Sequence, residues 1–465
     1  MSPDSPPLAA EAERSAGSER HSRLLTALAG VVAVLILGGA ALVWAGLPGA
    51  GPDDGSRGGP VTSPSGGPGP STGSPSAPAE PTRAEAVEAL LLARADAVEA
   101  GDRSAFLDTV DPLHVEFLQA QSTLFERLQE VPVAEWSYQL VGEGPPLSDE
   151  RAAQLPEESA IVRVRLTYQL DGTATVTDRE QYLTVVPRGG RWLLAGDTDG
   201  SESGLDTQRD VWDLGPVRAV RGERSLVVGD TRGADRREMQ RLADEADMAV
   251  EDVDEVWQAE WARAALVVLP RTQKDMAALI GSDGKGLAQI AAVTTGSFEE
   301  GLSRGNRIVI NPAAFDTLGS LGRRVVLSHE MTHVATRATS VQPVPIWLSE
   351  GFADYVAYAA TPVPTTIVAS DVLDDVRDGN GPRELPDETD FDAGEGDVAA
   401  AYEGAWLACR MIAETYGEKR LVRFYEAMAD SAGPGWPEET ADVLGVGARK
   451  LTRDWRRYLA DKAAE

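Results

Sequence analysis

The sequence predicts an α+β protein with one N-terminal transmembrane helix and two folded domains after it. Three observations support this prediction. An uncharged apolar run fills residues 24–47, a Gly/Pro/Ser-rich segment follows at 48–82, and helix-like and strand-like patterns then continue to residue 463. A chain of 465 residues has room for two or three domains with separate cores. We expect a small α+β domain at 83–200 and a larger one, with a mixed sheet and a helical C-terminal part, at 211–463.

The apolar run from Leu24 to Leu47 contains 24 residues without a charge. About 20 apolar residues in a helix span the hydrocarbon layer, whereas the apolar part of a cleaved signal peptide is about 7–15 residues long. Three arginines precede the run. Because positive charge stays on the cytoplasmic side, we expect residues 1–23 inside the cell and the chain after Leu47 outside, anchored in the cell membrane by this single helix. The alternative is a cleaved signal with a mature chain that starts near Gly46.

The composition narrows the range of partners. The net charge of −31 argues against a nucleic-acid partner, because neutralising phosphates requires basic patches. Residues 48–82 are too poor in large apolar side chains to fold, and we interpret them as a flexible spacer. The single cysteine, Cys409, permits no internal disulfide. We expect it to be a small core residue of a helix.

The first folded unit combines helices with a sheet. A helical apolar period starts at Arg83 and stops at Gly101, and a second one follows Pro112. Four segments with alternating apolar residues then predict strands: WSYQLVG, IVRVRLTYQL, DREQYLTVVP and RWLLAGDT. This order, together with GDRSAFLDTVDP after the first helix, resembles the nuclear-transport-factor-like (SnoaL-like) cone domains. Such cones include enzymes and non-catalytic binding modules, so the fold alone decides no function.

The second unit begins near Val211 with strands and a long helix. SLVVGD and AALVVLP are predicted strands on either side of ADRREMQRLADEADMAVEDVDEVW, and AQIAAVTTGSF with RIVINPAAF predicts a hairpin. Helices follow from about Leu318 to Arg337 and again after VPIW, where Ser349 is a candidate cap. The acidic residues 361–399 predict a loop that either covers a cleft or is simply solvated. The remaining segments are helical.

One five-residue motif in this unit can bind a metal ion. The segment His329-Glu330-Met331-Thr332-His333 matches HExxH. Residues four apart on a helix share one face, so the two imidazoles can bind the same ion. Glu330 then lies beside the ion and can take a proton from a metal-bound water. The alternative is two helix histidines with a solvent-facing glutamate.

A catalytic zinc site needs a third protein ligand. No histidine follows the motif, and Thr339 occupies the place where metzincins have their third histidine. The remaining candidates are a carboxylate and Cys409. In WLSEGFADY, Glu350 and Asp354 are four apart and share a helix face. Glu350 can bind the metal, and Asp354 can accept the second ring N–H of a histidine ligand.

HEMTH followed by WLSEGFADY resembles the gluzincin metallopeptidases of the thermolysin-like clan, which have a zincin-type fold. The resemblance implies Zn²⁺ bound by His329, His333 and Glu350. It also implies Glu330 as general base and acid, and Asp354 as a hydrogen-bond acceptor for a histidine ligand. The substrate that it implies is a peptide or protein. Sixteen residues separate His333 from Glu350, slightly fewer than is usual in the clan. There an edge strand beside the HExxH helix pairs with the substrate, and IAAVTTG or RIVIN would take that place.

Tyr402-Glu403-Gly404 resembles the Tyr-Glu-x-Gly of the aminopeptidase branch, with one residue missing. That resemblance implies Tyr402 as a catalytic donor to the oxyanion, and a plain helix-surface tyrosine is the alternative. The Gly-x-Met-Glu-Asn motif, which holds a free N-terminus in that branch, is absent from the sequence. Its absence argues against exopeptidase activity and favours an endopeptidase or a different specificity that the sequence does not define.

Together these features predict a membrane-anchored, extracytoplasmic, zinc-dependent peptidase. The rival hypothesis is a non-catalytic ligand-binding surface protein with an inactive peptidase fold. The complete set of His329, Glu330, His333 and Glu350 argues against that rival, because an inactive site usually lacks one of them.

Overall fold

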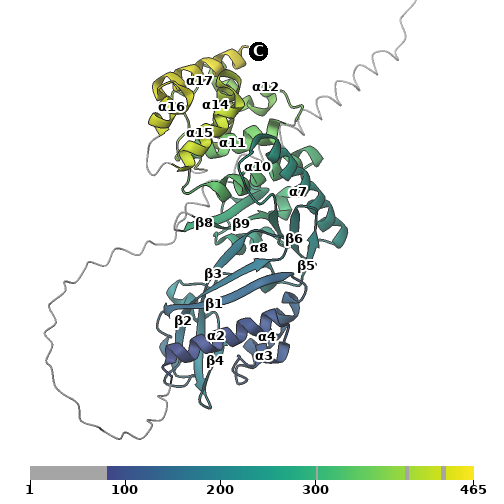
Figure 1. The fold of residues 1–465 in the computed structure, drawn as a ribbon, viewed down its shortest axis with the longest axis vertical. Helices are drawn as coiled ribbons and strands as arrows, with labels where there is room; N and C mark the ends of the chain where they lie inside the picture. The colour runs from purple at the N-terminus through teal and green to yellow at the C-terminus, as the bar shows by residue number, and fades with distance from the viewer. Residues whose placement is uncertain (1–80, 300–301, 360, 393–396, 431–435) are drawn as a thin grey trace, which may run out of the picture.

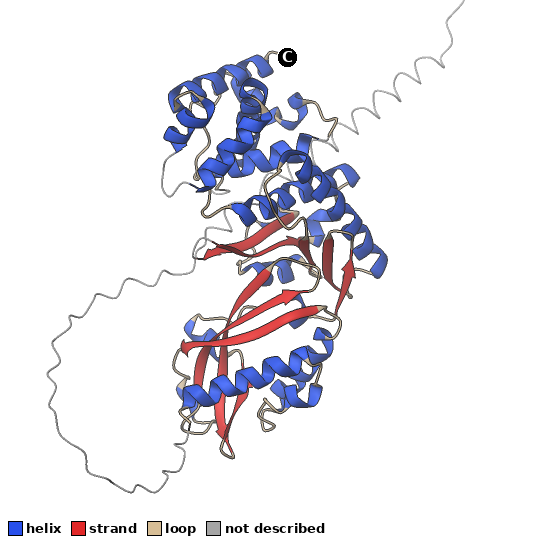
Figure 2. Cartoon of the chain, viewed as in Figure 1, coloured by secondary structure: helices blue, strands red, loops and turns tan. Residues whose placement is uncertain are grey.

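The computed structural model describes residues 81–299, 302–359, 361–392, 397–430 and 436–465. These residues form two β-sheets and many helices, and the last part of the chain is helical (Figures 1 and 2). The predicted mixed α+β class is therefore confirmed for this part of the chain. The predicted transmembrane helix at 24–47 and the spacer up to residue 80 lie outside the described residues. Among the residues that are described, no helix combines the length and apolarity needed to cross a membrane.

The first sheet consists of four antiparallel strands in sequence order, as the alternating patterns predicted. The helix α2 begins with a capping box between Thr82 and Glu85 and ends just before Gly101, which has a positive φ of 65°. It packs on β1 and β4. The elements are α2 (Arg83–Glu99), α3 (Arg103–Leu107), α4 (Val115–Leu128), β1 (Val133–Glu143), α5 (Asp149–Ala152), β2 (Ala160–Leu170), β3 (Val176–Arg188), β4 (Arg191–Gly196) and the 3-10 helix η1 (Asp199–Ser203). The resemblance to a cone domain stays a prediction.

The second sheet is mixed and has the strand order β5-β6-β7-β9-β8. Its three inner strands are parallel, and the two outer ones run antiparallel to their neighbours. The strand β8 therefore lies at an edge, while β9 is internal. Of the two candidates for an edge strand, only the segment around residues 290–296 qualifies. The elements are α6 (Val211–Leu214), β5 (Val217–Arg221), β6 (Ser225–Asp230), α7 (Arg236–Val256), β7 (Ala265–Leu269), α8 (Gln273–Ile280), η2 (Leu287–Gln289), β8 (Ala292–Glu299) and β9 (Leu302–Ile310).

Both faces of this second sheet are covered. Val227, Val267 and Ile308 face the helices α7 and α10 (Ser320–Thr339) within one large apolar cluster. Their neighbours Val228 and Val268 face the opposite way, into a cluster that also contains Trp136 and Tyr168 of the first sheet. Burial on both faces explains why the inner strands are almost entirely apolar. The expected domain boundary between residues 200 and 211 stays a prediction.

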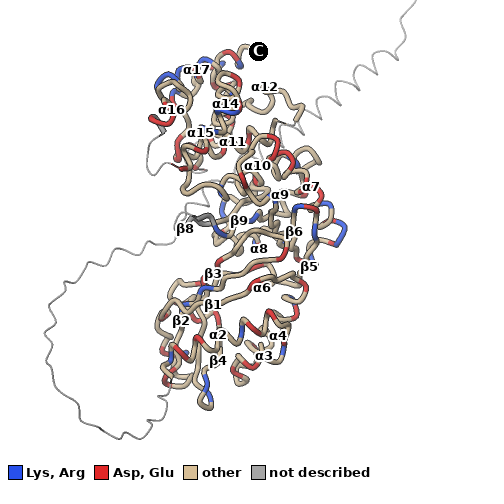
Figure 3. The backbone as a smooth tube through the Cα atoms, viewed as in Figure 1, with Lys and Arg blue, Asp and Glu red and all other residues tan. Residues whose placement is uncertain are grey.

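Acidic and basic residues are interspersed on both halves of the described chain (Figure 3). Asp and Glu outnumber Lys and Arg by 74 to 43 in the whole sequence. Because both halves carry acidic side chains, the excess negative charge is not confined to one end of the fold.

The helices after the second sheet form the C-terminal part of the described chain (Figure 1). The helix α11 packs between α10 and α14. Cys409 lies on α14 and is fully buried, as predicted for a core residue. The elements are α9 (Pro312–Phe315), α10, α11 (Ile346–Ala359), α12 (Thr365–Val368), α13 (Ser370–Arg377), α14 (Val398–Tyr416), α15 (Glu418–Asp430), α16 (Trp436–Leu444) and α17 (Ala448–Ala463).

Two local predictions in this part were wrong. Ser349 does not cap a helix, because α11 already begins at Ile346, and the Ser349 N–H donates to the carbonyl of Pro345 at 3.0 Å. The acidic segment 361–399 is not simply a loop, since it contains α12 and α13. Val372 and Leu373 of α13 are fully buried, but the surrounding acidic residues obscured their short apolar period.

Gly351 allows α11 and α14 to approach closely. A Cβ atom at this position would lie 2.6 Å from the carbonyl carbon of Ala405 and 3.1 Å from Sγ of Cys409. Both atoms belong to α14, and the carbonyl cannot move without shifting that helix. Gly351 directly follows Glu350, so this close contact also fixes the position of Glu350.

We predict that Gly351→Ala lowers the free energy of unfolding and weakens metal binding at Glu350. Overpacking costs about 1–3 kcal/mol, of which the better helix propensity of alanine returns about 1 kcal/mol. Denaturant unfolding and metal titration measure the two effects. Gly447→Ala is the control, because a Cβ there meets no atom within 4 Å. Equal behaviour of the two variants would contradict the packing argument.

Candidate metal centre

The helix α10 carries the HExxH motif through the interior of the protein. His329, Glu330 and His333 are 5%, 4% and 2% exposed, which rules out the solvent-facing alternative for Glu330. The helix packs on β8 and β9 of the second sheet and also contacts the helices α7 and α11. Asp252 on α7 holds it there by accepting hydrogen bonds from Nε of Arg324 at 2.8 Å and Oγ of Ser328 at 2.7 Å.

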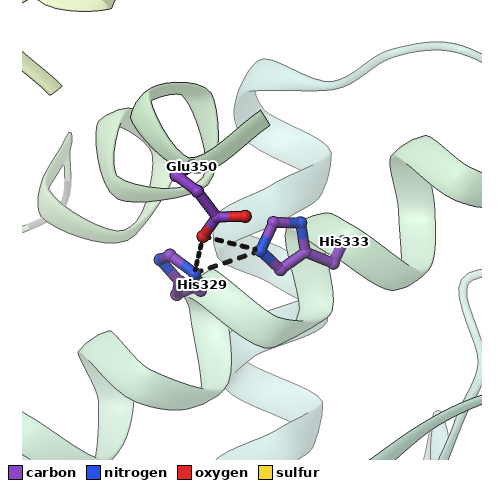
Figure 4. A group of neighbouring side chains, drawn as sticks. All are labelled: His329, His333 and Glu350. Atoms are coloured by element: carbon purple, nitrogen blue, oxygen red, sulfur yellow. Dashed lines mark hydrogen bonds and ion pairs between the residues drawn. The ribbon is translucent and has the colours of Figure 1, made fainter. Parts of the chain in front are cut away.

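The helix α11 brings Glu350 to the two histidines of α10 (Figure 4). Oε2 of Glu350 lies 3.3 Å from Nε2 of His329 and 3.4 Å from Nε2 of His333. The two Nε2 atoms are 3.1 Å apart. Within the described residues, this is the one group of His, Cys, Asp or Glu side chains arranged to hold a metal ion. The residues predicted as ligands thus lie together, and Cys409 is not among them.

The donor atoms fit a tetrahedral zinc ion. Ligand atoms about 2.0–2.1 Å from one such ion are about 3.3 Å apart, and the three observed separations are 3.1, 3.3 and 3.4 Å. Among the described residues, Oε2 of Glu350 receives no hydrogen bond although it is buried. A buried carboxylate oxygen without a donor is costly, and a cation at this position removes that cost.

Asp354 determines which nitrogen of His329 faces the other ligands. Nδ1 of His329 lies 2.8 Å from Oδ1 of Asp354. Because a carboxylate can only accept a hydrogen bond, Nδ1 carries the ring proton. The lone pair of the imidazole is then on Nε2, on the side of His333 and Glu350. Asp354 is in the position expected from its spacing to Glu350.

The charges of the cluster depend strongly on one another. Burial alone raises the pKa of Glu350, but His333 and His329 hold that pKa well below its usual range. Burial lowers the pKa of His329, but Asp354 and Glu350 raise it well above its usual value. Without a metal, the cluster therefore retains a proton on a histidine. A metal ion must displace this proton, so its affinity falls with increasing acidity.

Glu330 contacts the edge strand β8. Its Oε2 atom lies 2.7 Å from the hydroxyl oxygen of Thr294, which is also 2.9 Å from the backbone carbonyl of Glu330. Arg337, one turn beyond His333 on α10, donates from Nη1 to the carbonyl of Thr294 at 2.9 Å. Neither Thr294 nor Arg337 was predicted from the sequence as a site residue. The only signal was their placement in the predicted edge strand and motif helix.

Tyr402 and Glu403 lie on α14. Tyr402 is 2% exposed, so it is not a surface tyrosine, and its ring packs edge-on against Phe391 at 4.9 Å. Its catalytic role stays a prediction. Glu403 accepts a hydrogen bond from the Val372 N–H at 2.8 Å in the first turn of α13. Burial raises the pKa of Glu403 to about 9, so this side chain is uncharged at neutral pH.

No family model matches the chain, and no curated protein matches it. Among solved structures, a two-domain M1 zinc metallopeptidase mutant bound to L-arginine aligns at 12% identity and a TM-score of 0.31, over 59% of this chain and 58% of that one. The M1 zinc metallopeptidase from Deinococcus radiodurans aligns at 12% and 0.29, over 60% and 59%. A mutant of that enzyme bound to a Tyr-Ser-Ala substrate aligns at 15% and 0.29, over 71% and 70%.

The chain thus spans less than two thirds of the first two of these solved chains. Likeness at these scores carries no conclusion about function. The functional interpretation rests instead on the geometry of His329, His333, Glu350 and Glu330.

We predict about one zinc ion per chain, lost on removal of a ligand. Replacing a residue that hydrogen-bonds to a metal ligand weakens metal affinity about 10–100-fold. His333→Ala and Glu350→Ala each remove a ligand itself, so they should weaken zinc affinity more. Elemental analysis of the purified protein and competition with a chelator measure this. Cys409→Ala is the control and should retain zinc. Stoichiometric zinc in both His329→Ala and His333→Ala would refute the assignment.

Proposed function

We propose that this chain is a zinc-dependent peptidase that hydrolyses peptide bonds, with Glu330 as the general base. The observation that carries the proposal is the convergence of His329 Nε2, His333 Nε2 and Glu350 Oε2 at separations of 3.1–3.4 Å. Glu330 lies on the same buried helix, next to the first of these ligands. A closed structural zinc site uses four protein ligands, whereas three ligands leave a position for water or substrate.

Zinc held by His329, His333 and Glu350 would lower the pKa of a water molecule to about 7 and polarise a carbonyl oxygen. Glu330 would accept the proton of the attacking water on its Oε1 atom, because Oε2 accepts from the Thr294 hydroxyl at 2.7 Å. It would then donate this proton to the departing amine. Asp354 keeps His329 in the tautomer that has its lone pair on Nε2, through the contact of 2.8 Å. Tyr402 is our candidate for a second donor to the developing oxyanion.

The rival is a binding protein in which the peptidase fold is inactive. Its catalytic residues would be under no constraint to converge, yet His329, Glu330, His333 and Glu350 are all buried together in one place. Extended peptide is the substrate class that we propose for β8, which lies at the edge of the second sheet, since an edge strand can pair with a peptide backbone.

We predict that Glu330→Gln retains zinc and loses hydrolysis. The amide cannot accept the proton, and general acid–base groups contribute about 10²–10⁴-fold to rate. A peptide-library cleavage assay, with elemental analysis on the same sample, gives both readouts. Glu251→Gln, an exposed site on α7, is the matched control and should be unaffected. Wild-type cleavage by Glu330→Gln would exclude the proposed mechanism.

We also propose that the peptidase is anchored in the cell membrane through residues 24–47 and faces outward. The proposal rests on the length of the apolar run and on the arginines before it. Protease added to intact cells should then release a soluble fragment that begins between residues 48 and 82 and keeps its zinc. Release only after lysis would reverse the orientation. A mature chain that already starts near Gly46 would identify a cleaved signal instead.

A further inference from the structure

Three polar contacts of 2.7–2.9 Å join Thr294 of β8 to α10. The Thr294 hydroxyl oxygen is 2.7 Å from Glu330 Oε2 and 2.9 Å from the Glu330 carbonyl, and Arg337 Nη1 donates to the Thr294 carbonyl at 2.9 Å. Thr294 is 1% exposed and Glu330 is 4% exposed. Glu330 precedes His333 by three residues and Arg337 follows it by four. Thr294 thus contacts α10 at one residue before and one residue after the proposed metal ligand His333.

The strand register explains why Thr294 faces α10. Thr294 pairs with Ile308 of β9, and directly opposed residues of an antiparallel pair project from the same face of the sheet. Ile308 belongs to the apolar cluster beneath α10, whereas Val293 and Val309 belong to the cluster on the other face. Thr294 is therefore a polar side chain in a mainly apolar contact between sheet and helix. Valine would fill the same volume, so packing alone does not account for the hydroxyl.

We propose that Thr294 is a positioning residue for the general base: its hydroxyl holds Oε2 of Glu330 and thereby leaves Oε1 to receive the proton of the attacking water. This inference rests on the proposed function. Without the hydroxyl, a carboxylate on a buried helix can rotate and present either oxygen, or neither, to the water. Geometric placement of a proton acceptor precedes its pKa in deciding whether it can act.

Arg337 fixes Thr294 from the backbone side. Burial lowers the pKa of the Arg337 guanidinium, and the nearby carboxylates of Glu350 and Glu330 partly offset this decrease. Because Arg337 and Glu330 lie on the same helix, a shift of β8 relative to α10 strains both contacts at once. The edge strand that we propose for substrate binding thus also determines the orientation of the base.

The test compares variants at position 294 in the zinc-loaded full chain. Thr294→Val and Thr294→Ala remove the hydroxyl, and Thr294→Ser retains it. A hydrogen bond to a charged group is worth about tenfold or more in an equilibrium, so we expect kcat to fall about tenfold in the first two, with KM and zinc affinity within about twofold of wild type. Thr294→Ser should restore kcat.

Thr184→Val is the matched control. Thr184 is a fully buried strand residue of the first sheet, and its hydroxyl also donates to a carboxylate, Asp199, at 2.6 Å. The control loses the same kind of hydrogen bond far along the chain from the motif. It should become less stable to denaturant while keeping the wild-type kcat.

A second measurement does not depend on activity. In the metal-free chain, the losses in denaturant midpoint caused by Thr294→Val and Glu330→Ala should be non-additive, because both remove the same hydrogen bond. Additive losses overturn the proposal, as does a wild-type kcat in Thr294→Val and Thr294→Ala, or a Thr294→Ser variant as slow as Thr294→Val. Glu330→Gln in the cleavage assay separates failure of the proposed function from failure of the positioning role of Thr294. If it cleaves at the wild-type rate, the proposed function itself fails. If it is inactive while Thr294→Val is unimpaired, only the positioning role fails.

Discussion

The structure depends most on one electrostatic constraint, which is the burial of Glu350 between two imidazoles. A carboxylate removed from water is costly unless it is paired or hydrogen-bonded, and Glu350 Oε2 receives no hydrogen bond from any described residue. Asp354 keeps the proton of a neutral His329 on Nδ1, so Nε2 of that ring turns a lone pair toward Glu350. A proton shared by the imidazole pair, or a bound cation, would stabilise the carboxylate. Glu350 cannot move away from the histidines to avoid this cost. The close contact at Gly351 fixes α11 against α14, and hydrogen bonds to Asp252 fix α10. A divalent ion bound there would remove this cost, so we propose that metal binding also stabilises the fold.

The first sheet contributes to the site through β9. Arg307 on β9 is 2% exposed, pairs with Asp210 and donates to the carbonyl of Leu279 at 3.2 Å. Asp210 also accepts from Arg179 on β3 at 3.2 Å. This buried network connects the first sheet to the neighbour of β8, the strand that carries Thr294. Buried ion pairs are weak evidence for stability, but each partner requires the others to stay in place. The network therefore fixes how the two halves of the described chain pack.

The sequence predicted those features that depend on local periodicity. Residues four apart placed His329 with His333 and Glu350 with Asp354, and alternating apolar residues identified most of the strands. Features that depend on residues far apart in the sequence could not be predicted from it. The Thr294 contact requires the sheet order and the face of β8, and α13 is stabilised by burial of Val372 that its acidic surroundings concealed. Ser349 looked like a cap because Pro345, which precedes the start of α11 at Ile346, has no side chain that can cap a helix.

Zinc K-edge X-ray absorption on the purified protein would identify the ligands of the bound ion. We expect one zinc ion with two imidazole nitrogens and one carboxylate oxygen at about 2.0–2.1 Å, a further light-atom ligand, and no sulfur. Addition of a peptide hydroxamate should change only the light-atom ligand, because the three protein ligands come from α10 and α11. A sulfur neighbour at about 2.3 Å, which only Cys409 or a methionine supplies, or a protein without zinc, would contradict the account.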